Sequence, residues 1–133
     1  MSARRLIAAV FAVVLNGCDT MIADRIVIRA SAQYPGPGVT RPELLSTMRA
    51  AMTECNLPPT QIEAHGATLH WSDPKRLPGL HLMIHDSGDD LRVTLAQDLY
   101  GPVGPTDAYQ CVQKALRRQL VERFGKDRVH LES

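Results

Sequence analysis

The chain has 133 residues, with 15 basic and 14 acidic side chains, and 44% of its residues are hydrophobic. This length allows one domain, and the near-neutral charge excludes the basic surface on which nucleic-acid binding depends. The apolar content excludes a largely disordered chain. We therefore expect one globular domain that binds no nucleic acid.

The first 18 residues carry the clearest targeting signal. Arg4 and Arg5 precede ten apolar residues, 6–15, which are followed by Asn16-Gly17-Cys18. Ten residues of helix span about 15 Å, half of the hydrocarbon core of a bilayer, so this segment is too short for a transmembrane helix. The pattern is typical of a signal peptide.

The ending Leu15-Asn16-Gly17-Cys18 resembles the lipobox of bacterial lipoproteins, with Asn16 standing where that family usually has a small or hydroxylated residue. The resemblance implies that residues 1–17 are a cleaved signal peptide. It also implies that Cys18 carries acyl chains, palmitate among them, and becomes the mature N-terminus. Two or more acyl chains hold a protein stably at a bilayer.

The residues after the cysteine set the expected location. Asp19 resembles the inner-membrane retention signal of enterobacterial lipoproteins. We therefore expect the periplasmic face of the bacterial inner membrane, with the outer membrane as the alternative. Residues 18–24 would be the lipidated cysteine and a short tether; the six tether residues, 19–24, reach at most about 20 Å, so the domain would lie against the bilayer.

Residues 25–133 form the predicted periplasmic domain. Five segments have the alternation of half-buried strands; they are 25–30, 67–71, 80–85, 91–95 and 128–132. Two segments, 40–56 and 106–124, have helical spacing of apolar residues. The first begins with a capping box at Thr40, and the second begins with Thr106 as its N-cap. This order predicts an α+β fold, with two helices on one face of a small mixed, mostly antiparallel sheet of about five strands.

The strand register predicts one covered and one open face of this sheet. Pairing residue 84 with 91, and residue 71 with 80, keeps the apolar side chains on the covered face. Val129 and Leu131 of the last strand are expected there too. The open face then carries His70 beside His81, with these residues nearby: Met83, His85, Arg92, Thr94 and His130.

Cys55 and Cys111 remain once Cys18 is acylated. Outside the cytoplasm such a pair predicts a disulfide, which would close a loop of roughly 57 residues and contribute about 4 kcal/mol in the chain-entropy model. Bonded cysteines need Cα atoms within about 7 Å. We expect that approach if the two helices are antiparallel, and parallel helices would exclude the bond.

The open face is the first candidate site. Two histidines on adjacent strands can bind a divalent metal, and an added acid would complete a zinc or copper site. Because no HxH, HExxH or CxxC spacing accompanies His70 and His81, we expect no metal or other cofactor. We interpret the face as a surface for a protein partner, to which imidazole and methionine side chains adapt well. A solvated face without a function is the alternative.

The Pro/Gly-rich loops at Tyr34 and Tyr100 are a second candidate partner surface, unless each tyrosine simply packs over a helix end. The chain has no GxSxG elbow, P-loop, GxGxxG or EF-hand pattern, so we expect that it is not an enzyme. Its layout looks like that of accessory lipoproteins of envelope machines. We expect a membrane-anchored periplasmic binding or accessory subunit of a cell-envelope complex. The alternatives are an immunity lipoprotein against a periplasm-targeted toxin, and a metal or small-ligand carrier that uses the surface histidines.

Overall fold

A computed structural model describes residues 22–30, 38–62, 68–73, 78–98 and 104–132. The strands are β1 (Ile22–Ile28), β2 (Thr60–Ile62), β3 (Thr68–Trp71), β4 (Leu80–Ser87), β5 (Asp90–Gln97) and β6 (Val129–Glu132). The helices are α2 (Arg41–Glu54) and α3 (Asp107–Phe124), with a short 3-10 turn, η1 (Lys126–Arg128), before β6. Neither α2 nor α3 is both long and apolar enough to cross a bilayer.

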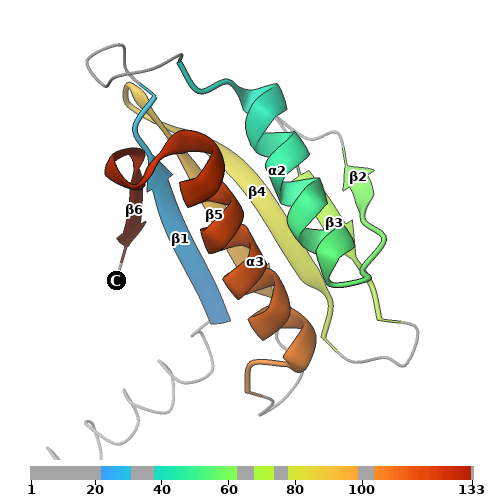
Figure 1. Cartoon of the computed structure of the whole chain (residues 1–133). Helices are drawn as coiled ribbons and strands as arrows, with labels where there is room; N and C mark the ends of the chain where they lie inside the picture. Colours follow the sequence, from blue (N-terminus) through green and yellow to red (C-terminus); the bar gives the residue numbers. More distant parts are fainter. Residues whose placement is uncertain (1–21, 31–37, 63–67, 74–77, 99–103, 133) are drawn as a thin grey trace, which may run out of the picture.

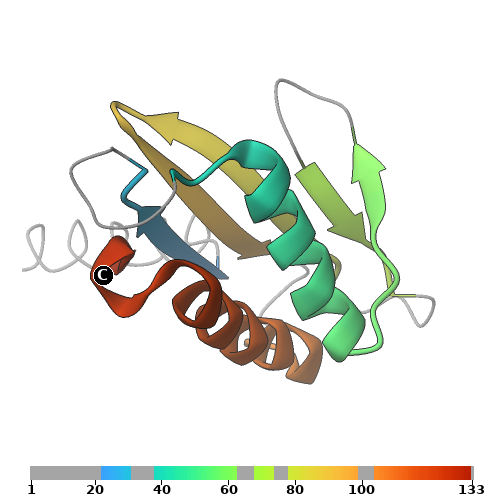
Figure 2. The ribbon, with the colours of Figure 1, turned by 45° about the horizontal axis from the view of Figure 1, so that its top comes forward.

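The strands form one antiparallel sheet in the order β2-β3-β4-β5-β1-β6, and both helices lie on the same face of it (Figures 1 and 2). The α+β prediction is therefore confirmed, although the sheet has six strands instead of about five. The additional strand, β2, has only three residues, too few for an alternating pattern to be visible in the sequence. β1 begins at Ile22, so the expected tether overlaps it by residues 22–24.

The helix ends follow the predicted capping chemistry. The Thr40 hydroxyl accepts from the Glu43 amide, and the Glu43 carboxylate accepts from the Thr40 amide at 3.0 Å, which is a complete capping box. Thr106 caps α3 by accepting from the Tyr109 amide at 3.1 Å. After α2 the chain turns at Asn56 with φ 58°, a left-handed conformation that asparagine tolerates better than most residues.

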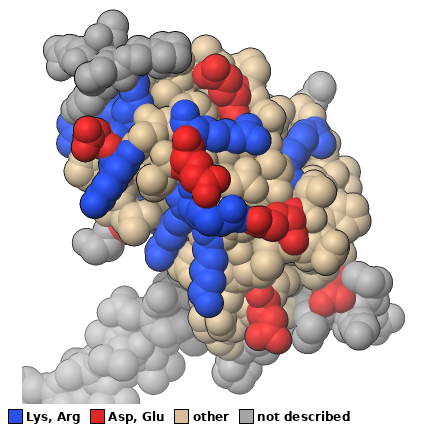
Figure 3. Space-filling model, in the orientation of Figure 1, with Lys and Arg blue, Asp and Glu red and all other residues tan. Residues whose placement is uncertain are grey.

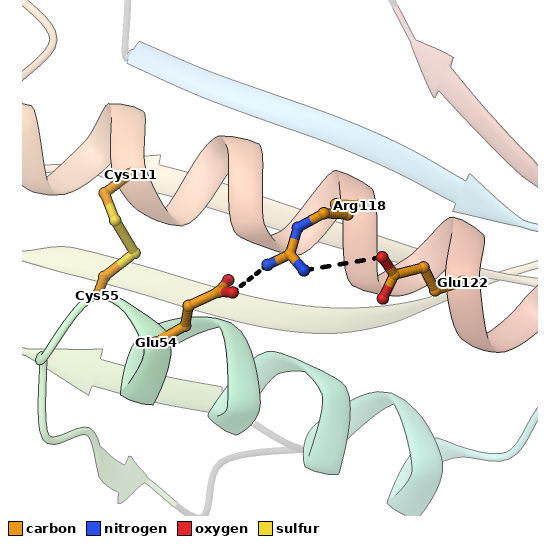
Figure 4. A network of polar contacts seen from close by, with 5 residues as sticks. All are labelled: Glu54, Cys55, Cys111, Arg118 and Glu122. Atoms are coloured by element: carbon orange, nitrogen blue, oxygen red, sulfur yellow. Dashed lines mark hydrogen bonds and ion pairs between the residues drawn. A yellow bond between two sulfur atoms is a disulfide. The ribbon is translucent and has the colours of Figure 1, made fainter.

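Three contacts show that α2 and α3 are antiparallel. Cys55, at the end of α2, is bonded to Cys111 near the start of α3, with 6.0 Å between their Cα atoms (Figure 4). Further along, Glu54 pairs with Arg118, and the Thr47 hydroxyl accepts from Arg123 at 3.3 Å. From the first of these contacts to the last, the residue numbers fall in α2 and rise in α3. The predicted disulfide and helix directions are confirmed.

The core lies between the sheet and the two helices. Fully buried apolar side chains come from the inner face of the sheet and from one stripe of each helix; they include Ile26, Leu69, Leu82, Val93, Leu95, Leu44, Met48, Val112, Leu116 and Leu120. Gln97 is 1% exposed; its amide donates to the Gly104 carbonyl and its carbonyl accepts from the Thr106 amide. This buried side chain fixes the start of α3 against the end of β5.

The observed register differs from the predicted one in one hairpin. Trp71 pairs with Leu80 as predicted, but Ile84 pairs with Val93 instead of Leu91. The strands continue to Ser87 and Asp90 and leave a two-residue turn, in which Gly88 has φ 64°, the conformation that tight hairpins require. A shift of two residues keeps every side chain on its face, so the division into two faces was predicted correctly.

Leu131 takes the predicted face, because it pairs with the buried Ile26, but the expectation that it is buried in the core is wrong. Leu131 is 54% exposed, whereas Val129 packs against the core as expected. β6 is the edge strand and lies to one side of α3 (Figure 1). Its far end therefore has no helix over it among the described residues.

Candidate functional site

The face of the sheet opposite the helices brings the predicted histidines together. His70 of β3 pairs directly with His81 of β4, and their ring centroids are 4.5 Å apart. Neighbours along each strand alternate between faces, so Leu69 and Leu82 are fully buried on the covered side. The two imidazoles are thus held side by side by the backbone ladder.

An acidic side chain completes this cluster. Asp98 follows the last residue of β5, and its Oδ1 lies 2.5 Å from Nε2 of His81. One ligand atom from each of His70, His81 and Asp98 lies within 4.8 Å of the other two. The side chains of His81 and Asp98 are 30% and 39% exposed, so the cluster is open to solvent on one side.

Gly79 makes room for the cluster. The Asp98 amide donates to the Gly79 carbonyl at 2.9 Å, which continues the β4–β5 ladder by one residue. A Cβ at Gly79 would lie 2.9 Å from Oδ2 of Asp98 and 3.4 Å from Nε2 of His70. It would also lie 2.7 Å from the Trp71 carbonyl oxygen. Only a glycine there lets both side chains converge.

Ser72 lies at the edge of the same cluster. Its hydroxyl is 3.5 Å from Nε2 of His70, while Asp98 contacts His81. The serine and the aspartate therefore contact different histidines. A Ser-His-Asp relay needs one histidine between the other two groups, so this arrangement does not provide one.

The other predicted residues of the open face form separate rows. Met83 pairs with Thr68 and Thr94. His85 pairs with Arg92, whose guanidinium donates to Glu132 at 3.0 Å. His85 is four residues from His81 along β4, about 13 Å away.

His130 also lies on the open face, because it pairs with Val27, which pairs with Arg92. It is on the edge strand β6, three strands away from β4. It therefore faces the same side as the His70–His81 pair but is remote from it. Cys18, Tyr34 and Tyr100 lie outside the described residues.

A cleft of about 670 Å³ opens at the end of the domain that carries the disulfide. It lies where α2 ends, α3 begins and β3 ends; its lining includes Asn56, Pro58, Trp71, Ser72, Thr106 and Ala108. Ser72 belongs both to the cleft and to the edge of the histidine cluster. No sequence pattern indicates this cleft, because it is made of segment ends that only the tertiary fold brings together.

Acidic and basic side chains are interspersed on the helical face (Figure 3). Arg118 lies between Glu54 and Glu122 (Figure 4), and Arg117 pairs with Asp24 at 2.6 Å. These pairings leave no large patch of a single sign on the described part of this face.

One titratable group in the described residues has a clearly shifted pKa. Burial raises the pKa of Tyr109 from 10.0 to about 12, the negative charge of Asp24 adds to this effect, and Arg117 opposes it. Tyr109 lies in the first turns of α3, on the core side. It is remote from the open face, and the shift follows from its place in the core.

The described residues thus offer two imidazoles and one carboxylate at one end of a sheet face that carries both polar and apolar side chains. Such a set can accept and donate hydrogen bonds to a partner, and it can also coordinate a cation. The chain matches no protein-family model, no curated protein and no solved structure.

Proposed function

We propose that this protein is a lipid-anchored accessory subunit of a bacterial cell-envelope complex. Acylated Cys18 holds it at the periplasmic face of the membrane, and the open sheet face binds an envelope protein. The observation that carries this proposal is the unequal use of the two sheet faces. Both helices pack on one face (Figure 2), and the opposite face presents His70, His81 and Arg92 from adjacent strands.

The disulfide supports an extracytoplasmic location. The Cys55–Cys111 bond links the two helices across a sequence separation of 56 residues. Such bonds persist in oxidising compartments and are rare in the reducing cytoplasm. A signal peptide that ends in a lipobox-like sequence delivers a chain to such a compartment.

The composition of the open face indicates the kind of contact it makes. His81, Met83 and Arg92 are each partly buried by their neighbours, so the face offers polar and apolar side chains that are only partly accessible. A mixed surface of this kind suits a modest interface of the transient class. The anchor compensates for this weakness, because confinement to the membrane raises the effective concentration of the domain around a membrane-bound partner.

The test is a crosslinking pull-down of the full lipidated protein in cells. The wild type is compared with a His70→Ala, His81→Ala, Arg92→Ala triple variant. Lys114→Ala is the matched control, because Lys114 is exposed on α3, on the other side of the domain. We expect one stoichiometric envelope protein, retained by the control and lost from the triple variant.

Other outcomes of this experiment reject the proposal. Capture of a secreted toxin would favour an immunity lipoprotein. A partner that the triple variant retains would place the interface elsewhere than on the open face. Failure to capture any protein would remove the accessory role.

A further inference from the structure

We propose that His70, His81 and Asp98 bind a divalent transition metal ion, with Zn²⁺ as the best fit. Imidazole nitrogens and a carboxylate oxygen are standard zinc ligands, and three protein ligands leave a fourth position for water or for an incoming group. This site extends the function proposed above and does not depend on it, because the argument rests only on the three side chains and the backbone that holds them.

The distances between the ligand atoms are close to those in a zinc site. Zinc lies about 2.0 to 2.1 Å from its nitrogen and oxygen ligands, so two ligands of a tetrahedral site are about 3.3 Å apart. Nε2 of His81 and Oδ1 of Asp98 are 2.5 Å apart, and all three ligand atoms lie within 4.8 Å of one another. The ligand-to-ligand distances therefore need to change by at most about 1.5 Å, and these partly exposed side chains can move that far.

Backbone pairing positions all three ligands, two of them on strands and Asp98 one residue beyond a strand. His70 and His81 are a directly paired position of the β3–β4 ladder. Asp98 is fixed one residue beyond β5 by the hydrogen bond from its amide to the Gly79 carbonyl. Sites on strands are held more accurately than sites on loops.

A simple ion pair between His81 and Asp98 explains less of the geometry. An ion pair between His81 and Asp98 does not require the ring of His70 to lie with its centroid 4.5 Å from that of His81. It also does not require a glycine next to the side chains of His70 and Asp98. Gly79 instead leaves space in which Nε2 of His70 and Oδ2 of Asp98 both come within 3.4 Å of the place where a Cβ would be. The convergence of a third ligand distinguishes a metal site from a pair.

The charge of the cluster also suits a divalent cation. A neutral imidazole brings no charge and the Asp98 carboxylate brings one negative charge, which offsets half of the ion's charge. The borderline character of Zn²⁺ matches this nitrogen and oxygen set, whereas Mg²⁺ and Ca²⁺ prefer sites made of oxygen ligands. Cu²⁺ would bind the same ligands, since it stands above zinc in the general affinity order.

The test uses the full chain in detergent, freed of metal with a chelator that is then removed. Zn²⁺ is titrated by calorimetry, and Co²⁺ reports its ligands by its visible absorption. His70→Ala, His81→Ala and Asp98→Asn are compared with His85→Ala and His130→Ala. The two control histidines are exposed on the same sheet face but lie outside the cluster. Circular dichroism checks that each variant is folded.

We expect the wild type to bind one Zn²⁺ and each of the three cluster substitutions to weaken binding at least about tenfold, the scale on which even outer-shell changes act. The two controls should keep the affinity of the wild type. Equal affinities in all five variants, or no binding by the folded wild type, would overturn the proposal. Neither result depends on the pull-down, so a failure here leaves the accessory role to be judged by its own experiment.

Discussion

Asp98 and His70 converge on the place where Gly79 has no side chain, with Oδ2 of Asp98 at 2.9 Å and Nε2 of His70 at 3.4 Å from it. The amide of Asp98 donates to the Gly79 carbonyl at 2.9 Å, and its Oδ1 lies 2.5 Å from Nε2 of His81. One glycine thus decides whether the open face has a three-ligand cluster or only two neighbouring histidines.

Gly79→Ala should therefore disturb both stability and the cluster. The new Cβ would meet the Trp71 carbonyl oxygen at 2.7 Å and Oδ2 of Asp98 at 2.9 Å, so the backbone or the carboxylate must shift. We expect a loss of about 1 to 3 kcal/mol in the free energy of unfolding, typical of overpacking, and weaker zinc binding. Urea denaturation and zinc titration measure the two effects. Gly104→Ala is the control, because nothing lies within 4 Å of its Cβ position; equal stability of both variants would contradict the argument.

Most of the architecture could be predicted from periodicity and capping, but the third ligand could not. The predicted pairing of 84 with 91 puts residue 96 opposite Gly79, whereas the observed pairing of Ile84 with Val93 puts Asp98 there. Both registers keep apolar side chains on the covered face, so burial alone does not distinguish them. The tight turn at Gly88 sets the register. In the sequence, this turn is indicated only by the local conformational preference of the glycine.

The disulfide was predictable for a different reason. Only two cysteines remain after Cys18, and their bond sets the directions of the helices once their positions near the helix ends are known.

The cleft beside Trp71 and Ser72 was not predictable, because its walls come from segments far apart in the sequence. The exposure of Leu131 shows a similar limit, since alternation indicates which face a residue takes but not whether anything covers that face.

The disulfide should contribute much of the stability. Cys55→Ser with Cys111→Ser opens a loop whose ends are 56 residues apart in sequence, and the chain-entropy model gives a loss of about 4 kcal/mol. Urea denaturation of the wild type and the double variant measures the loss. Reductant should destabilise the wild type and leave the double variant unchanged. Free thiols at both positions in periplasmic material without reductant would refute the bond.

The anchor is tested by Cys18→Ser. A serine cannot be acylated at this position, so we expect the variant to lose incorporation of labelled palmitate and to leave the membrane fraction. Cell fractionation and metabolic labelling make the measurement. Cys55→Ser with Cys111→Ser serves as the control and should stay labelled and membrane-bound; label that persists in the Cys18 variant would exclude the lipoprotein assignment.

The pKa of Tyr109 predicts the alkaline limit of stability. Burial and the charge of Asp24 raise this pKa from 10.0 to about 12, so the folded state favours the neutral phenol. Because this pKa is raised, the contribution of the neutral Tyr109 phenol to the stability of the fold is complete below pH 10. It is lost as the pH rises from about 10 to about 12. Two pKa units correspond to roughly 2 to 3 kcal/mol.

Tyr109→Phe removes the ionisable group and keeps the ring in the core. Between pH 10 and 12 the variant should lose less stability than the wild type, which urea denaturation at a series of pH values measures directly. Phenolate absorbance in the folded wild type should show one tyrosine that ionises later than the others, and the variant should lack this late step. If the wild type and the variant lose stability in parallel over this range, Tyr109 ionises as an exposed tyrosine does, and its packing between the sheet and α3 is not what sets its pKa.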